Sequence, residues 1–166
     1  VSDIGGCVTT FAKAIRNMLR RSPDIILIGE SRDLETIEAT IRAATTGHMT
    51  YTTLHAGSVG ECVRRILNEF PEGAKQARLY ELMPLLNFIV VQHLAKTIDG
   101  KRVALREFLV FTTEIVEELQ DCPMDSVVTR INSFVNSHGQ SMEVAAKKQL
   151  DLGVISESEY RHAASC

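Results

Sequence analysis

A run of four aliphatic residues, Ile25-Ile26-Leu27-Ile28, constrains the fold of this chain more than any other stretch of its sequence. Pro23 precedes the run and ends any helix before it, because a proline keeps the residue in front of it out of the helical region. Continuous apolarity without polar alternation is typical of a strand that is buried on both faces, as in a parallel sheet. We therefore predict a doubly buried strand of a parallel α/β sheet at this position.

Helical and strand patterns alternate around this run. Apolar residues recur at helical spacing in three segments, residues 10–21, 33–47 and 58–70. Asp33 and Ser58 are predicted N-caps, the latter with Glu61 at capping-box spacing, and Gly47 ends the second of these helices. Residues 49–54 are rich in Thr and Tyr and predict a second strand. This short alternation of helices and strands favours a doubly wound parallel sheet.

After Pro71 the sequence no longer alternates between helical and parallel-strand patterns. A short helix is predicted over residues 74–83, and the apolar runs 88–94 and 103–111 around Asp99-Gly100 predict a β-hairpin. From Thr113 onward the chain is predicted to be helical, ending in a helix that Ser156 caps. We expect an α/β part over residues 1–112 and a helical tail over residues 113–166.

Composition narrows the possible functions. The chain has 166 residues, of which 45% are hydrophobic and 23% charged, as in an ordinary globular protein. A formal net charge of −3 gives no reason to expect direct contact with nucleic acid. The four cysteines are scattered without a CxxC pair, which argues against a zinc ribbon or disulfide framework and fits a reducing cytosol. The longest stretch without a charged residue or a histidine, residues 82–92, is too short to span a bilayer.

Glu30 is the first candidate for chemistry, because it follows the predicted strand directly after Gly29. In open α/β sheets ligands bind at the carboxyl ends of the strands. A carboxylate there can orient an attacking water, or hold a metal-bound water against a phosphate. The alternative is that Glu30 merely caps the helix that follows.

His48 and His55 stand at the two ends of the second predicted strand, seven residues apart. An odd separation along a strand places two side chains on opposite faces, so we expect no shared metal ion. Each histidine is open to a purely structural role. His55, however, would lie on the same sheet edge as Glu30, a position that suits a donor facing a phosphate.

Residues 19–33 read Leu-Arg-Arg-Ser-Pro-Asp-Ile-Ile-Leu-Ile-Gly-Glu-Ser-Arg-Asp. This stretch resembles a signature of the hexameric secretion ATPases, the PilT- and GspE-like superfamily that drives type II secretion, type IV pilus retraction and type IV secretion. Every position matches except Ser31, where the superfamily usually has an aliphatic residue. Glu30 matches its atypical Walker B glutamate, and residues 47–55 resemble its histidine box. The resemblance covers residues 3–111, and the tail is most similar to the branch of DotB and conjugative TraJ.

The resemblance implies a fragment of a RecA-like P-loop NTPase core, with a β-hairpin and a helical tail. Glu30 would activate water on Mg2+-bound ATP, and His55 would contact the γ-phosphate region. His48, Gly29 and Arg32 would belong to the nucleotide site with weaker support, and Arg32 is also open to local pairing. No metal bound by the chain itself is expected. The resemblance further implies a homo-hexamer on the cytoplasmic face of an inner-membrane secretion complex.

The departures from the superfamily pattern matter as much as the matches. The sequence contains no G-x-x-x-x-G-K-[ST] loop, since Gly100-Lys101 is followed by Arg102. Without that loop the phosphates lose their backbone cradle. The acidic box and arginine fingers are missing too, and the lack of a tetracysteine insertion argues against the type II branch. We expect the C-terminal part of a longer motor ATPase, inactive by itself.

Two other readings stay open at this point. The chain could act only as an assembly or interaction module of a secretion complex, without catalysis of its own. A RecA-like helicase is a weaker alternative, because the sequence has no basic stripe.

Overall fold

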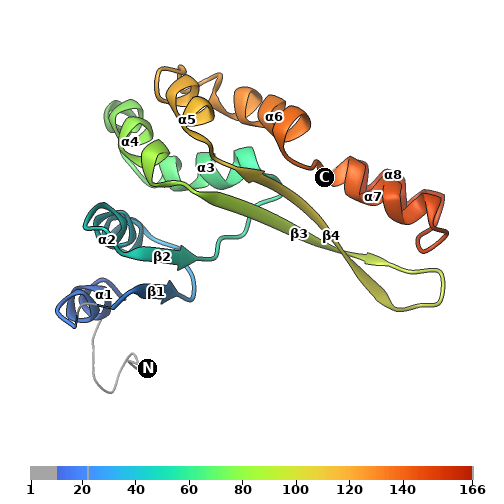
Figure 1. Ribbon diagram of the computed structural model, residues 1–166, viewed down its shortest axis with the longest axis horizontal. Helices are drawn as coiled ribbons and strands as arrows, with labels where there is room; N and C mark the ends of the chain where they lie inside the picture. Colours follow the sequence, from blue (N-terminus) through green and yellow to red (C-terminus); the bar gives the residue numbers. More distant parts are fainter. Residues whose placement is uncertain (1–10, 22, 166) are drawn as a thin grey trace.

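The computed structural model describes residues 11–21 and 23–165. Cys7, Cys166, the predicted first residue of the first helix (Thr10) and the superfamily resemblance over residues 3–10 lie outside the described residues. The first half of the fold alternates helices and strands: α1 (Phe11–Leu19), β1 (Ile25–Ile28), α2 (Leu34–Thr45), β2 (Met49–Thr52) and α3 (Val59–Asn68) (Figure 1). The predicted helix–strand alternation is thus confirmed for the described residues.

Strands β1 and β2 pair in parallel, with Ile25 opposite Met49 and Ile28 opposite Thr52. The expectation that β1 is buried on both faces is wrong. Ile26 and Ile28 are buried at 1% and 3% exposure, whereas Ile25 and Leu27 are 61% and 71% exposed. The inner residues pack on α1 and α2, through Ile15 and Ala43, while none of the described elements covers the outer face.

Local capping explains where α2 and α3 begin. The Asp33 carboxylate accepts a hydrogen bond from the amide of Thr36 at 2.8 Å, and the Ser58 hydroxyl accepts one from the amide of Glu61 at 3.2 Å. Gly47, just beyond α2, has a φ of 89°, which glycine adopts without strain. All three predicted signals are confirmed: Asp33 and Ser58 start α2 and α3 a few residues after a parallel strand, and Gly47 follows the end of α2.

The second half of the fold is built around a long β-hairpin. Strands β3 (Phe88–Lys96) and β4 (Arg102–Val110) pair antiparallel and are joined through Asp99-Gly100, as predicted. The helix predicted over residues 74–83 is also present, although it divides into three pieces: η1 (Glu72–Ala74), α4 (Lys75–Leu82) and η2 (Met83–Leu85). Pro84 lies in the last piece.

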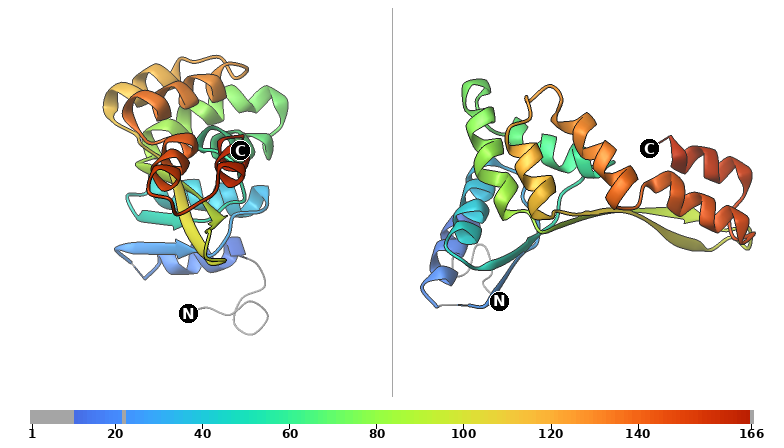
Figure 2. Two further views of the ribbon diagram at one scale, coloured as in Figure 1. Left: turned by 90° about the vertical axis from the view of Figure 1, so that its right-hand side faces the viewer. Right: turned by 45° about the horizontal axis from the view of Figure 1, so that its top comes forward.

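Four helices follow the hairpin: α5 (Thr113–Gln120), α6 (Val127–His138), α7 (Met142–Asp151) and α8 (Glu157–Ala164). Helices α7 and α8 lie along the distal part of the hairpin, while α5 and α6 lie near α3 and α4 (Figures 1 and 2). Ser156 caps α8, as predicted, by accepting from the amide of Glu159 at 3.3 Å. The fold is therefore α/β, with a parallel strand pair, flanking helices, a hairpin and a helical tail.

The main hydrophobic core runs through α3, α4, the hairpin and all four C-terminal helices. Leu67, Leu109 and Ile131 are fully buried in it, and they come from both sides of residue 112. The division into residues 1–112 and 113–166 stays a prediction, with continuous packing across that point. Within the part of the chain that the structure describes, no helix combines the length and apolarity needed to cross a bilayer.

Candidate functional site

The structure brings Glu30, Arg32 and His55 together beyond the carboxyl ends of β1 and β2. An Oε atom of Glu30 lies 2.6 Å from Nη2 of Arg32, and the other lies 3.2 Å from Nε2 of His55. Glu30 comes directly from the loop after β1, and His55 comes from the loop after β2. Because parallel strands end at the same edge of a sheet, two residues 25 positions apart converge there.

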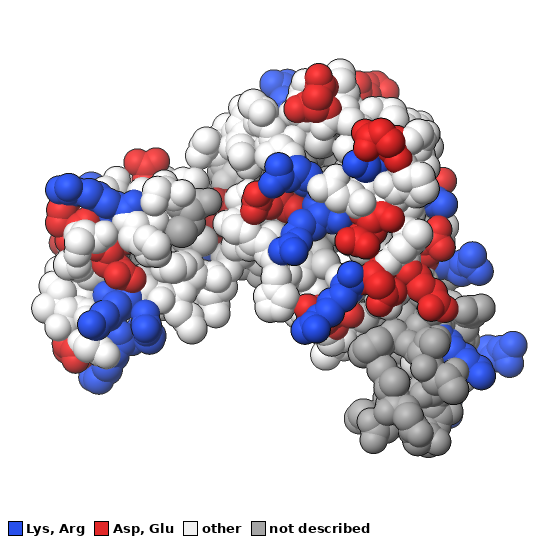
Figure 3. Space-filling view, turned by 180° about the vertical axis from the view of Figure 1, so that it is seen from behind, with Lys and Arg blue, Asp and Glu red and all other residues white. Residues whose placement is uncertain are grey.

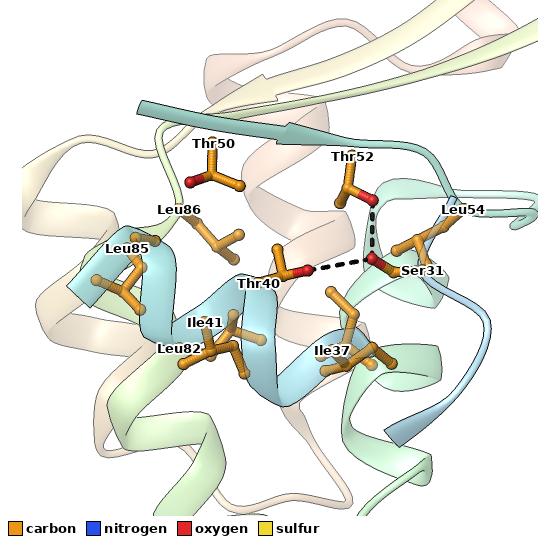
Figure 4. Close-up of a pocket in the computed structure, with 12 residues that line it drawn as sticks. Ser31, Ile37, Thr40, Ile41, Thr50, Thr52, Leu54, Leu82, Leu85 and Leu86 are labelled. Atoms are coloured by element: carbon orange, nitrogen blue, oxygen red, sulfur yellow. Dashed lines mark hydrogen bonds between the residues drawn. The ribbon is translucent and has the colours of Figure 1, made fainter. Parts of the chain in front are cut away.

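A set of short bonds ties the two loops that carry Glu30 and His55. The amide of Ser31 donates to the carbonyl of Thr53 at 3.2 Å, and the Thr53 hydroxyl donates to the carbonyl of Gly29 at 2.5 Å. The hydroxyls of Ser31 and Thr52 are 2.8 Å apart (Figure 4). Ser31 is 4% exposed, so its own bonds are largely shielded from water, and together the three bonds hold the loops in register.

Helix α3 also contributes to the site, through Arg65. The guanidinium of Arg65, in the last turn of α3, donates to the backbone carbonyl of His55. The residues surround an open cavity of about 470 Å³, large enough for part of a nucleotide, and it is lined by Glu30, Ser31, Arg32, Ile37, Leu54, His55, Arg65 and Glu69. The cavity therefore joins the two strand ends to α3.

Charge at this edge is arranged to keep Glu30 ionised. The hydrogen bond from Arg32 lowers the pKa of the Glu30 carboxyl, and the charges of Arg32 and His55 act in the same direction. The Glu30 side chain is 23% exposed and that of His55 is 82% exposed. A charged carboxylate that water can reach, beside an accessible imidazole, can orient a water molecule toward an electrophile.

His48 does not join this cluster. It precedes β2, at the amino end of the strand, where its Nδ1 lies 3.1 Å from the Thr46 hydroxyl. Gly29 contributes its carbonyl to the bonds between the loops. Arg32 pairs with Glu30, the local role that was left open for it, and Asp33 caps α2 as predicted. Within the described residues, no group of three or more His, Cys, Asp or Glu side chains is placed to hold a metal ion.

Three contributions to the site were not predicted from the sequence: the bond from Arg65, the bond from Thr53, and the hydrogen bonds of the Ser31 hydroxyl. Arg65 lies at the end of an amphipathic helix, where a basic residue has an ordinary role. Ser31 did give a signal, because it stands where the superfamily usually has an aliphatic residue. Its hydroxyl faces those of Thr40 and Thr52 at the rim of a small apolar cavity of about 100 Å³ between β2, α2 and α4 (Figure 4).

Away from the site, charge is mixed rather than segregated. On the face shown in Figure 3, acidic and basic side chains of the described residues are interspersed over the helices and the hairpin. Several form ion pairs within a helix, such as Arg64 with Glu61 at 2.6 Å and Lys147 with Asp151 at 2.7 Å. Such a face carries no continuous field of one sign.

Comparison with known proteins agrees with this arrangement. The model of the family described as "Type II/IV secretion system protein" matches residues 5–152. The chain therefore belongs to the family of type II/IV secretion system proteins.

Curated relatives are similar over almost the whole chain. The type IV pilus retraction ATPase PilT of Pseudomonas aeruginosa is 34% identical over 154 residues, which cover 93% of this chain and 45% of PilT. A twitching motility protein of Neisseria gonorrhoeae is 34% identical over 160 residues, covering 93% of this chain and 42% of that protein. The chain thus spans less than half the length of these relatives.

Solved structures give the same family and add the fold. The Legionella pneumophila ATPase DotB superposes with a TM-score of 0.93 at 38% identity, over 99% of this chain and 44% of DotB. The pilus retraction motor PilT with bound ADP superposes with a TM-score of 0.84 at 32% identity, over 96% of this chain and 45% of PilT. The chain has the fold of part of these RecA-like ATPases, as the sequence resemblance implied.

Proposed function

We propose that this chain carries the water-activating part of an ATP site in a motor ATPase that powers a type IV secretion or plasmid conjugation apparatus. The observation that carries the proposal is the meeting of Glu30 with His55, 3.2 Å apart, at the carboxyl edge of a parallel strand pair. Membership of the secretion family and the ADP bound to the related PilT structure support the choice of nucleotide.

In this proposal the three side chains have separate tasks. Arg32 keeps Glu30 ionised, so that the carboxylate accepts a hydrogen bond from the attacking water and orients it. His55, which is largely exposed and held through its backbone by Arg65, presents its imidazole toward the γ-phosphate. The carboxylate oxygens of Glu30 also suit a hydrated Mg2+, which would neutralise phosphate charge when bound. His48 would act only through the strand between it and His55.

The phosphate cradle must come from elsewhere in a longer protein. The 166 residues contain no G-x-x-x-x-G-K-[ST] loop, and the relatives are more than twice as long as the part matched here. Positioning and charge neutralisation supply most of phosphoryl-transfer catalysis. The chain alone is therefore expected to show no ATP turnover above background. In the longer protein we propose a homo-hexamer at the cytoplasmic face of an inner-membrane secretion complex, without direct contact with nucleic acid.

Substitution of Glu30 tests the proposal in a longer protein that joins these residues to a phosphate loop. Glu30→Gln keeps the size of the side chain and removes its charge, so kcat should fall by ~10²–10⁴ while ATP binding survives. The matched control is Glu35→Gln, an exposed position at the start of α2, which should cost little. Steady-state ATPase assays and nucleotide-binding titrations measure both quantities.

Near-normal turnover of Glu30→Gln, together with loss of turnover in Glu35→Gln, would show that the acid is misassigned. If the longer protein lacks ATPase activity altogether and still binds other secretion components, the chain is an assembly module instead.

The two histidines give a second test. His55→Ala should reduce kcat by ~10² or more, because it removes a group that faces the phosphate. His48→Ala should have a much smaller effect, because His48 lies at the far end of β2. Equal losses in the two variants would contradict the assignment of the carboxyl edge as the reacting side.

A further inference from the structure

Glu107 is a buried carboxylate that does not line the cavity described above. It lies on β4 and is only 8% exposed, within a strand whose other inward residues are apolar. Burying an ionisable side chain is costly unless polar partners compensate for the lost water. The partners of Glu107 therefore indicate why this residue is placed there.

Both oxygens of Glu107 accept backbone hydrogen bonds, and they do so from two different helices. Oε1 accepts from the amide of Val59 at 2.7 Å, and Oε2 accepts from the amide of Met142 at 3.3 Å. Val59 is the first residue of α3, and Met142 is the first residue of α7. The first amides of a helix have no partner within the helix, and the helix dipole favours a negative charge at this end. The Glu107 carboxylate thus accepts hydrogen bonds from the first amides of two helices, α3 and α7.

Helix α3 connects Glu107 with the candidate site. Its first residue, Val59, is fixed by Glu107, and its last turn carries Arg65, which holds the carbonyl of His55. Helix α7 belongs to the C-terminal helices that lie along the hairpin (Figure 1). Glu107 is therefore the hydrogen-bonded junction between those helices and the helix that positions His55.

We propose that Glu107 is a positioning residue: its ionised carboxylate docks the starts of α3 and α7 on β4 and so fixes Arg65 and His55 relative to the C-terminal helices. The catalytic part of this proposal rests on the proposed function, whereas the docking part does not. A displacement of α7, for example by a neighbouring protein, would reach His55 through this carboxylate.

Cys62 provides an internal reporter of the Glu107 charge. Burial of the Cys62 thiol on α3 raises its pKa to about 11, and the negative charge of Glu107 is the next cause. A neutral side chain at position 107 should therefore lower the pKa of Cys62 while leaving its burial unchanged.

Amide hydrogen exchange of the chain, followed by NMR, tests the double docking. In Glu107→Gln the amides of Val59 and Met142 should both exchange about tenfold faster, because each loses a bond to a charged acceptor. Two control variants, Glu61→Gln and Glu143→Gln, alter the charge in the first turn of one helix only. Each control should affect its own helix and leave the other unchanged. Faster exchange in only one helix, or in neither, would overturn the proposal.

The thiol titration of Cys62 provides a second, independent measurement, made with Cys7, Cys122 and Cys166 replaced by serine. The pKa of Cys62 should fall in Glu107→Gln, and an unchanged value would show that Glu107 carries no charge in the folded chain. Should Glu107→Gln fail to fold, Ser141→Ala loosens α7 by removing its N-cap hydroxyl. This variant should then shift the NMR signals of Val59 as well as Met142, and a change confined to α7 would overturn the docking.

In the longer protein, Glu107→Gln should lower kcat about tenfold and change the KM for ATP less than twofold. An unchanged kcat, in a variant whose helix starts have loosened, would overturn the link to catalysis and leave the docking in place. Failure of the proposed function itself would appear separately, as a normal kcat in Glu30→Gln.

Discussion

Two regions of this molecule are packed very differently. The parallel-pair region, residues 11–52 without residue 22, has a small cluster of buried apolar side chains among its described residues: Ile15, Ile26, Ile28 and Ala43. The hairpin region, residues 59–164, has a core of 23 buried residues that draws on α3, α4, both hairpin strands and all four C-terminal helices. Hydrophobic stabilisation scales with buried apolar area, so the hairpin region must supply most of it.

The outer face of the parallel-pair region is apolar and exposed, which adds to the difference in packing between the two regions. Ile25, Leu27, Met49 and Tyr51 share one face of the pair and are between 46% and 71% exposed. Glu30 and His55 nevertheless belong to the ends of these thinly packed strands. Their positions depend on bonds between loops and on Arg65, which comes from the better packed region. The candidate site residues thus belong to the parallel-pair region, and one of the contacts that hold them comes from the hairpin region.

The largest expected difference concerns core truncations. Leu109→Ala removes a fully buried side chain from the large core and should reduce the free energy of unfolding by ~2–5 kcal/mol. Ile26 is buried to the same extent but belongs to the small cluster. Ile26→Ala should change the free energy of the main unfolding transition by less than ~1 kcal/mol, because β1 and β2 can open locally. Urea denaturation followed by circular dichroism measures both. Equal losses would show that the two regions unfold as one unit.

A close backbone approach within the hairpin region gives a smaller effect. A Cβ atom at Gly139 would overlap the carbonyl oxygen of Phe108, so β4 or the end of α6 must move to accept it. Gly139→Ala should therefore destabilise the chain by ~1–3 kcal/mol in the same denaturation assay. Gly73→Ala is the matched control, since nothing lies within 4 Å of a Cβ there. An unchanged free energy of unfolding in Gly139→Ala would indicate that this core can rearrange more easily than its packing implies.

The smallest expected effect is electrostatic and belongs to the parallel-pair region. Arg32→Ala removes the hydrogen bond that lowers the pKa of Glu30, so this pKa should rise toward its ordinary value. A lowered pKa in the folded state means that the contribution of Glu30 to stability is present above about pH 4.5, its unfolded pKa. That contribution is lost as the pH falls through the folded pKa. NMR titration of the Glu30 carboxyl carbon, in the unsubstituted chain and in Arg32→Ala, measures this change in pKa. A lower pKa of Glu30 in Arg32→Ala would contradict the pairing.

The sequence by itself determined the local structure. Asp33, Ser58 and Ser156 cap the helices that they were predicted to cap, and the hairpin turns at Asp99-Gly100. These features depend on a few neighbouring residues, whose hydrogen bonds and backbone preferences are set within one turn. The convergence of Glu30 and His55 was also predictable, because the ends of parallel strands share an edge.

Only the tertiary structure decided which faces are covered and which distant groups meet. The apolar run at β1 was expected to be doubly buried, yet Ile25 and Leu27 are exposed, because burial depends on neighbouring elements and not on the strand itself. Glu107 bonds to Val59 and Met142, which are 48 and 35 positions away in the sequence. No periodicity or cap signal reports such a bond, since it forms only when a strand and two helix starts have been packed together.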